Sequence, residues 1–472
     1  MTSMNGRSAR RTWAFGAAAA FFVSLAVPFL ALFSAAPADA VTAGVGTNVP
    51  RYALHPVTAA PSVSVPKALA AAVGPTPHGP YTKVADECAT CHRTHTGQNK
   101  NLLKSASPQS NLCFTCHDGT GANTNVKAQY TDPAVPANNA TTRVIYRHDA
   151  VVTTSHRSAG LNEFGGVSNR HSECGDCHNP HQANATNSTP GATGATASGR
   201  LAGVSGVSVV NGATPGSTPT YTFLDGKTPA TSITREYQLC FKCHSGFTTL
   251  DPNAGFGSSR FRLDKAVEFN PNNLSHHAVE APGKNTTTAM GLSLSGASIY
   301  RQWTFVIGDT IRCSNCHASS TKYNQTTPPP ASGDLPVHTS QVAGILLAPY
   351  RNRILKPVGE AYSAAEFKLC FMCHATAPFS GSSTATNWSK HYGHTNTRNG
   401  TNTGGSDIDN PLANGGNAIC AECHFRIHST TYKDGTQTIP GNRLVNFSPN
   451  VTGARTWAGG NSCSLICHGK SH

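Results

Sequence analysis

The chain has 472 residues, a formal net charge of +13 and a hydrophobic fraction of only 38%. It also contains 44 glycines and 30 prolines. This composition excludes a large apolar core of the ordinary kind and, without another source of order, is typical of disordered chains. Covalent or metal-based cross-links must therefore stabilise the chain if it folds.

The first forty residues predict a secretory signal peptide. Three arginines give a basic start, an apolar run covers residues 13–36, and Ala38–Ala40 forms a small-x-small cleavage site. The run is long enough for an uncleaved membrane anchor, but Pro28 and the cleavage site favour removal. No second apolar run reaches membrane length. We expect an exported mature protein without a membrane span, located outside the cell, at its surface or in the periplasm.

All sixteen cysteines fall into eight sites that end in Cys-His. Seven sites have the spacing C-x-x-C-H, which is the attachment signature of c-type haem, and the eighth has one more spacer residue. In such sites both sulfurs bond to the porphyrin and the histidine binds its iron. We therefore predict eight covalently bound haem c groups. In chain order the sites are Cys88/Cys91/His92, Cys113/Cys116/His117, Cys174/Cys177/His178, Cys240/Cys243/His244, Cys313/Cys316/His317, Cys370/Cys373/His374, Cys420/Cys423/His424 and Cys463/Cys467/His468.

Zinc sites and disulfides are the other common uses of paired cysteines. Zinc would need two pairs in partnership and gives no reason for a histidine after every second cysteine. A disulfide framework would not repeatedly join cysteines three residues apart. Haem attachment accounts for both the spacing and the histidines, and the eighth site is the least regular case.

The sites alternate in type and form four tandem pairs, which is typical of an array built by duplication. The second, fourth and sixth sites read Leu-Cys-Phe-x-Cys-His, and the first, third, fifth and seventh do not. We expect a multihaem cytochrome c fold with little regular secondary structure, in which short helices and loops wrap around a chain of stacked haems. The predicted segments are a signal peptide 1–40, an N-terminal segment 41–75 and haem pairs 76–147, 148–275, 276–390 and 391–472.

The paired sites resemble the doubled C-x-x-C-H family of multihaem cytochromes. The segments 77–95 and 174–181 carry the resemblance best, and it extends from about residue 75 to the end. Extracellular members that polymerise into haem-wired filaments have a similar plan. In some of them an N-terminal histidine caps a haem of the next subunit. The resemblance thus implies other copies of this chain as partners, with His55 and His78 as the positions that could bridge them.

Eight further histidines recur at equivalent places in the repeat, and we predict that they bind the second axial face of the eight irons. One histidine precedes each pair of sites, and these are His78, His148, His276 and His391. One lies between the two sites of each pair, and these are His95, His181, His338 and His428. His277 is an alternative to His276, and His394 to His391. The remaining histidines, at positions 55, 156, 171 and 472, are spare.

Three of the between-site histidines follow a proximal histidine by only three or four residues: His95, His181 and His428. A side chain so close in sequence cannot reach the far side of the same porphyrin. We therefore expect each to bind the iron of a neighbouring haem and so to join haems together.

Two histidine nitrogens fill the coordination of an iron and leave no position for a substrate. Histidine as the sixth ligand also favours a low reduction potential. We expect a low-potential electron conduit without catalytic residues, passing electrons to other cytochromes or extracellular acceptors. Lys and Arg are expected to neutralise haem propionates, so we predict no nucleic-acid partner.

Two other functions stay open. One is an octahaem redox enzyme that resembles hydroxylamine oxidoreductase or the octahaem nitrite reductases, in which one iron would keep an open face. The Cys-x-x-Cys-Lys site of those reductases does not occur in the chain. The other is a periplasmic protein that stores or shuttles electrons, which shares the chemistry and differs in partner and place.

Overall fold

The chain divides into two units, Met1–Val65 and Pro66–His472, and all described residues belong to the second. The predicted signal peptide and the segment 41–75 lie outside the described residues. No described helix is long and apolar enough to cross a membrane. The computed structural model describes residues 78, 84–99, 101–122, 124–131, 146–151, 172–248, 263–320, 334–350, 367–376, 391, 420–430, 443–448, 451–457, 463–467 and 470–471.

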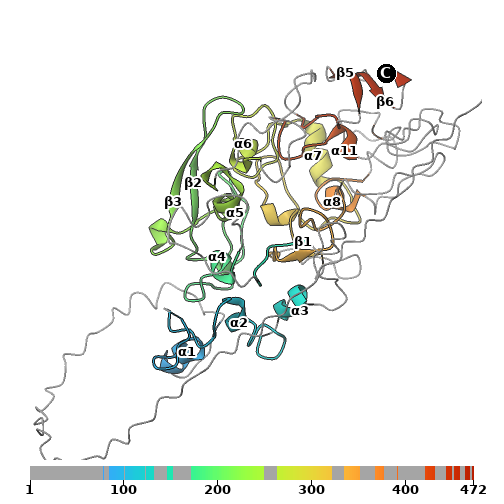
Figure 1. Ribbon diagram of the computed structural model, residues 1–472. Helices are drawn as coiled ribbons and strands as arrows, with labels where there is room; N and C mark the ends of the chain where they lie inside the picture. Colours follow the sequence, from blue (N-terminus) through green and yellow to red (C-terminus); the bar gives the residue numbers. More distant parts are fainter. Residues whose placement is uncertain are drawn as a thin grey trace, which may run out of the picture. The chain divides into compact units, whose positions relative to one another are not determined.

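The helices are short, and most of them carry cysteines of the C-x-x-C-H sites (Figure 1). One helical turn is enough to bring two sulfurs three residues apart to the same side. The prediction of little regular secondary structure with short helices is confirmed. The cysteine-bearing helices are α1 (Val84–Cys91), α2 (Ser110–Cys113), α4 (Cys174–Cys177), α5 (Glu236–His244), η8 (Cys313–Asn315), α8 (Lys368–Phe371) and α11 (Cys420–Cys423). The others are α3 (Val126–Thr131), η4 (Gly199–Leu201), η5 (Pro229–Thr231), η6 (Gly246–Thr248), α6 (Lys265–Phe269) and α7 (Thr288–Ser295).

Polar side chains start several of these helices. Asp264 accepts hydrogen bonds from the backbone N–H groups of Ala266 and Val267 at the start of α6. In the third site the backbone N–H of Glu173 donates to Asp176 at 2.6 Å, and in the fifth site that of Arg312 donates to Asn315 at 2.8 Å. These bonds satisfy backbone N–H groups that the start of a helix leaves open. They explain why the second spacer residue of these two sites is polar.

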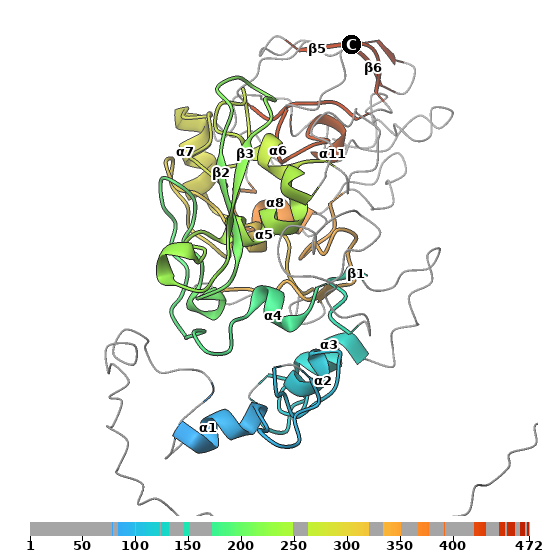
Figure 2. The same cartoon turned by 60° about the vertical axis from the view of Figure 1, so that its left-hand side comes forward.

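The strands are few and all pair antiparallel. β2 (Gly206–Val210) and β3 (Thr220–Leu224) form a hairpin in which Ser208 lies opposite Thr222. Helix α5 lies beside this hairpin in both views (Figures 1 and 2). β1 (Tyr146–Arg147) pairs with β4 (Thr339–Ser340), which joins segments nearly two hundred residues apart in sequence. The third sheet has the order β5 (Thr452–Trp457), β6 (Cys463–Cys467) and β7 (Lys470–Ser471).

The eighth site differs from the other seven. Its cysteines, Cys463 and Cys467, lie at the two ends of strand β6 rather than on a helical turn. Because a strand rises about 3.3 Å per residue, four residues separate the two Cα atoms by about 13 Å. The extra spacer residue removes the i, i+3 relation that a helical turn uses to bring two sulfurs together. The eighth haem therefore stays a prediction from the sequence.

The apolar core is built around the site helices. The largest cluster contains Trp303, Phe305, Tyr350 and Phe371, and Cys316, Cys370, Cys373 and Cys420 pack against it. A second cluster joins Phe241 and Phe269 to Cys313. Each buried side chain of this size stabilises the fold by about 1.5–3 kcal/mol. The largest cluster therefore gathers attachment cysteines of the fifth, sixth and seventh sites into one packed region.

Candidate haem-binding sites

The seven helical sites share one backbone arrangement. In six of them the N–H of the proximal histidine donates to the carbonyl of the first cysteine at 2.8–2.9 Å, and the seventh, His244, ends helix α5. None of the fourteen cysteines whose side chains are described forms a disulfide. No disulfide therefore competes for these sulfurs, and each turn offers two sulfurs and an imidazole close together.

The proximal rings of the odd-numbered sites are held by backbone carbonyls. Because a carbonyl can only accept, Nδ1 carries the proton and donates, and Nε2 is left with a free lone pair. Such a bond fixes the tautomer and orientation of a metal-binding histidine. The bonds join Nδ1 of His92 to Asn101 O at 2.9 Å, His178 to Arg200 O at 3.1 Å, His317 to Gly344 O at 2.7 Å and His424 to Leu444 O at 3.0 Å.

Even-numbered sites hold their rings differently. Nδ1 of His374 lies 3.0 Å from the hydroxyl oxygen of Ser293, which comes from α7. Nδ1 of His117 is buried and has no hydrogen-bond partner. In the first, fifth and seventh sites the chain that follows the site returns to it and forms an isolated β-bridge with the proximal histidine. This return brings backbone carbonyls close to the proximal ring.

Six proximal imidazoles face a second imidazole across a gap of constant width. Two nitrogens that each lie about 2.0 Å from one metal ion place their ring centres about 6 Å apart. The gaps therefore fit one iron between each pair of rings. The ring-centre distances are 6.1 Å for His92–His181, 6.3 Å for His78–His117, 6.2 Å for His178–His338, 6.1 Å for His148–His244, 6.0 Å for His317–His428 and 6.5 Å for His391–His424.

Five of these six pairs follow a rule that the sequence alone does not show; the exception is His391, which faces His424 in the first site of its own pair. A between-site histidine faces the first site of the preceding pair, as His181 of the second pair faces His92 of the first. The histidine before a pair faces the second site of its own pair, as His148 faces His244. The first three haem pairs are therefore each joined to the following pair by a histidine.

A histidine that precedes a pair of sites also contacts the segment that carries a between-site histidine. Nδ1 of His148 donates to Val337 O at 2.8 Å, and Val337 directly precedes His338. His78 makes the same contact with Pro180 O at 3.3 Å, before His181. One hydrogen bond thus orients a ring of one site and anchors the segment that carries the ring of another.

His277 occupies the third of these positions. Its Nδ1 donates to Ile427 O, before His428, and its backbone N–H donates to His428 O at 3.0 Å. His277 is also an electrostatic neighbour of His374, the sixth proximal histidine. His276 is buried as well, and its Nε2 has no hydrogen-bond partner. The repeated contact thus favours His277, the alternative named from the sequence, as the residue equivalent to His148.

His95 is placed unlike the other predicted ligands. Its side chain is exposed, and within the described part of the chain it faces no other imidazole. His92, three residues earlier, is already opposite His181. His394, His468 and the spare histidines lie outside the described residues.

Burial keeps several of these rings neutral. Burial lowers the pKa of His277, His317 and His374 to about 4, with smaller contributions from neighbouring histidines. A neutral imidazole is the form that binds a metal, because protonation occupies the nitrogen that would donate to it. These rings are therefore ready to bind iron at neutral pH without first losing a proton.

The cysteines of successive sites are neighbours in chain order. The thiols of Cys113 and Cys174 form a hydrogen bond, as do those of Cys240 and Cys313. Within each of the first three haem pairs, the second cysteine of one site interacts electrostatically with the second cysteine of the other site. These contacts join Cys91 to Cys116, Cys177 to Cys243 and Cys316 to Cys373. Sites one to six thus follow one another in space as they do in sequence, with two alternating kinds of junction.

Arg301 holds the chain around the sixth site. Its guanidinium donates to Cys373 O at 2.6 Å and Gly296 O at 2.5 Å, and also to Leu294 O. Replacing Arg301 with alanine should leave these carbonyls without donors, at about 1–3 kcal/mol for each buried group. We expect the R301A variant to lose at least about 3 kcal/mol of unfolding free energy in guanidinium denaturation. R301K, which keeps the charge but not the fork of donors, should lose less, and equal losses would contradict this role.

Residues 78–122 match the protein family described as the doubled CXXCH motif. The matched segment contains the first two sites and the facing histidine His78. The match indicates a multihaem c-type cytochrome. No curated protein and no solved structure matches the chain.

The described residues fit covalently bound haem c. Each helical site supplies two cysteines outside any disulfide and an imidazole, and six of these imidazoles face a second one at the spacing that an iron requires. The cysteines would hold the porphyrin and the histidines its iron, which when bound takes up and releases one electron. The protein contributes attachment, ring orientation and burial.

Proposed function

We propose that the protein is an octahaem electron-transfer cytochrome of low potential, in which two histidines bind each iron. The observation that carries this proposal is the set of six facing imidazole pairs with ring centres 6.0–6.5 Å apart. An iron with two imidazole ligands has no open position, so its function is electron transfer rather than binding of substrate. His277 completes the sixth site, and His394 or another histidine outside the described residues is left to serve the eighth.

The protein acts in this proposal as a conduit rather than as a set of independent carriers. Support comes from the neighbouring cysteines, which connect the first site to the second and continue in order to the sixth. Cofactors attached to neighbouring sulfurs lie close together, so from the first site to the sixth each haem has the next haem as a neighbour.

The place of action is outside the cytoplasm, and the partners are other redox proteins or extracellular acceptors. The apolar run at 13–36 and the cleavage site at Ala38–Ala40 support export. Polymerisation into filaments is part of the proposal and rests on the resemblance alone. His78 faces His117 within its own chain, which leaves His55 as the sequence position for a contact between copies. Electron microscopy of secreted protein that shows only single particles would count against filaments.

The decisive experiment is low-temperature electron paramagnetic resonance of the air-oxidised protein, together with a haem count by the pyridine haemochrome method. We expect eight haems per chain, all of them low-spin ferric. A count of seven would remove the eighth site and leave the function intact. A high-spin signal from one haem would mean an open iron, and a redox enzyme related to hydroxylamine oxidoreductase would then replace this proposal.

A further inference from the structure

The same contact joins two different pairs of sites. Gln109 lies four residues before Cys113, and its side-chain oxygen accepts the backbone N–H of Gly175 at 2.6 Å. Gly175 directly follows Cys174, the first cysteine of the third site. A Cβ on Gly175 would lie 2.8 Å from that oxygen, so glycine permits the approach. The contact therefore ties the second site to the third at their hydrogen-bonded first cysteines.

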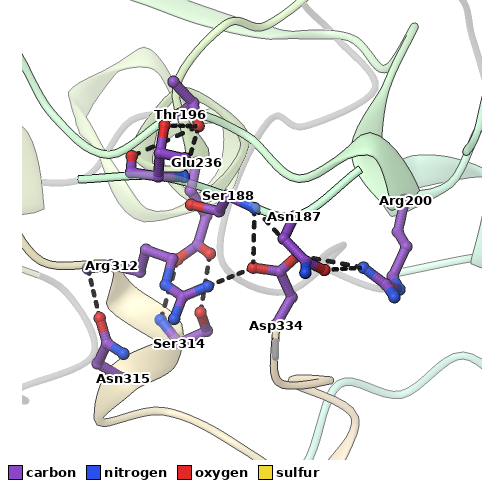
Figure 3. A network of polar contacts seen from close by, with 10 residues as sticks. Asn187, Ser188, Thr196, Arg200, Glu236, Arg312, Ser314, Asn315 and Asp334 are labelled. Carbon is purple, nitrogen blue, oxygen red and sulfur yellow. Dashed lines mark hydrogen bonds and ion pairs between the residues drawn. The ribbon is translucent and has the colours of Figure 1, made fainter. Parts of the chain in front are cut away.

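Glu236 repeats this contact two sites further on. It lies four residues before Cys240, and its carboxylate accepts the N–H of Ser314 at 2.9 Å and the Ser314 hydroxyl at 2.8 Å (Figure 3). Ser314 directly follows Cys313, as Gly175 follows Cys174. Position and geometry agree at the two junctions, and the chemistry differs: one residue is an amide and the other an acid.

We propose that Gln109 and Glu236 are clamps that hold consecutive haem pairs together, and that Glu236 also takes up a proton when an electron reaches the junction of the fourth and fifth haems, whereas Gln109 does not. The inference rests on the proposed function, because it needs haems on these cysteines. It makes the two residues positioning groups of the conduit. It also makes one junction of the conduit responsive to pH.

Glu236 lies close enough for its charge to act electrostatically on both neighbouring cofactors. Its carboxylate oxygen and the sulfurs of Cys240 and Cys313 lie within 4.8 Å of one another. Such a trio could hold a cation if the sulfurs were free thiolates. In the proposed function both sulfurs are thioethers, so no thiolate remains there. The carboxyl group then lies beside the attachment points of two successive haems.

The surroundings of Glu236 favour uptake of a proton. Its side chain is 7% exposed, and burial raises its pKa, against the opposing effects of Ser314 and Arg312. The charged groups that face it are Arg312 and Asp334. Arg312 forms an ion pair with Asp334, which Arg200 also binds at 3.2 Å (Figure 3). The positive charge of Arg312 is therefore shared with Asp334 rather than reserved for Glu236.

The sign of the effect follows from charge balance. An external reductant or an electrode supplies one electron to the junction, and the added negative charge raises the pKa of Glu236 further. Glu236 then binds one proton from solvent, and on oxidation it returns that proton. Because acid favours the reduced form, the midpoint potential of this junction falls as pH rises, by at most about 59 mV per pH unit for one electron and one proton.

Reciprocal exchange of the two clamps tests the proposal. Spectroelectrochemical titrations of the full-length protein would be run at several pH values on both sides of neutrality. In E236Q one redox component should no longer depend on pH. Its midpoint potential should stay at the higher value that the natural protein shows in acid. Q109E should gain a new pH-dependent component. D225N, which removes an exposed carboxylate paired with Lys227, should keep the natural pH dependence and serves as the control.

The clamp itself is tested by alanine. E236A removes both the hydrogen-bond acceptor and the acid, whereas E236Q keeps an acceptor. We expect electron equilibration after rapid chemical reduction to slow several-fold in E236A and to stay unchanged in E236Q. An E236Q variant with the natural pH dependence, or a Q109E variant without a new component, would overturn the assignment of the proton. Equal kinetics in E236A and E236Q would overturn the clamp.

Failure of the proposed function would look different. A high-spin signal or missing haem in the natural protein contradicts two histidine ligands at every iron, whatever the clamp variants do. Retained low-spin spectra in E236Q and Q109E show that the cofactors are still bound in those variants. The pH dependence then reports on the junction alone.

Discussion

Replacing His181 with alanine is expected to open one iron and to convert one haem from low-spin to high-spin ferric iron, whereas H95A should leave every haem low-spin. His181 faces His92 with ring centres 6.1 Å apart and ring planes 11° apart. His95 is exposed and faces no described imidazole. Both were predicted as ligands from the sequence, so the two variants separate the sequence-based expectation from the structural one. Electron paramagnetic resonance of the oxidised variants measures the outcome.

Added imidazole provides the control for this experiment. It should bind the opened iron of H181A and restore the low-spin signal, because it replaces the missing side chain. A general loss of structure would not be reversed in this way. If H95A gives the high-spin signal and H181A does not, the order of facing rings in the first pair is wrong.

Replacing Asp334 with alanine is expected to destabilise the protein by about 3–5 kcal/mol, because it breaks the buried ion pair with Arg312 by removing one partner. The two side chains are 9% and 8% exposed and form a direct ion pair. Asp334 also accepts the backbone N–H of Ser188 at 3.3 Å. Guanidinium denaturation followed by haem absorption measures the loss.

The double variant R312M/D334A is the matched control. Removing both charges should recover much of the stability lost in D334A, since an apolar pair of similar volume often replaces a buried ion pair without loss. Equal stability of the single and double variants would mean that the buried charge of Arg312 is not the cause. In that case the loss would come from the contacts of Asp334 with Ser188 and Arg200.

The sites themselves could be read from the sequence because C-x-x-C-H is a local pattern. Three residues of spacing place two cysteines on one side of a helical turn, and Cys174–Cys177 forms that turn with a capping box made by the nearby residues Glu173 and Asp176. The eighth site shows the limit of local reasoning. It has a Cys-His ending like the others, yet its backbone pairs as strand β6.

The facing histidines could be predicted only in part. Counting and repetition identified His148, His338 and His428 as candidates, but not which iron each one faces. That assignment depends on contacts between distant segments, such as the hydrogen bond from His148 N–H to His338 O at 3.1 Å. The choice between His276 and His277 is of the same kind. Adjacent residues of identical chemistry differ only in which ring meets Ile427 O.

The clamps escaped sequence reasoning for a related reason. Gln109 and Glu236 share a position relative to their sites, four residues before the first cysteine, but an amide and an acid do not look equivalent in a sequence. Glu366 holds the same position before Cys370 and lies outside the described residues. Only the common hydrogen bond to Gly175 or Ser314 reveals the shared role.

The sequence by itself determined the cofactor chemistry of this protein, because haem attachment needs only cysteines and a histidine within one turn of chain. It also determined the short-helix, loop-rich character, because the composition is too polar for a large apolar core. The tertiary structure alone decided which rings face each other, which cysteines are neighbours and which junction contains a buried acid. These properties arise where segments far apart in sequence meet, and the spacing of residues along the chain does not specify such meetings.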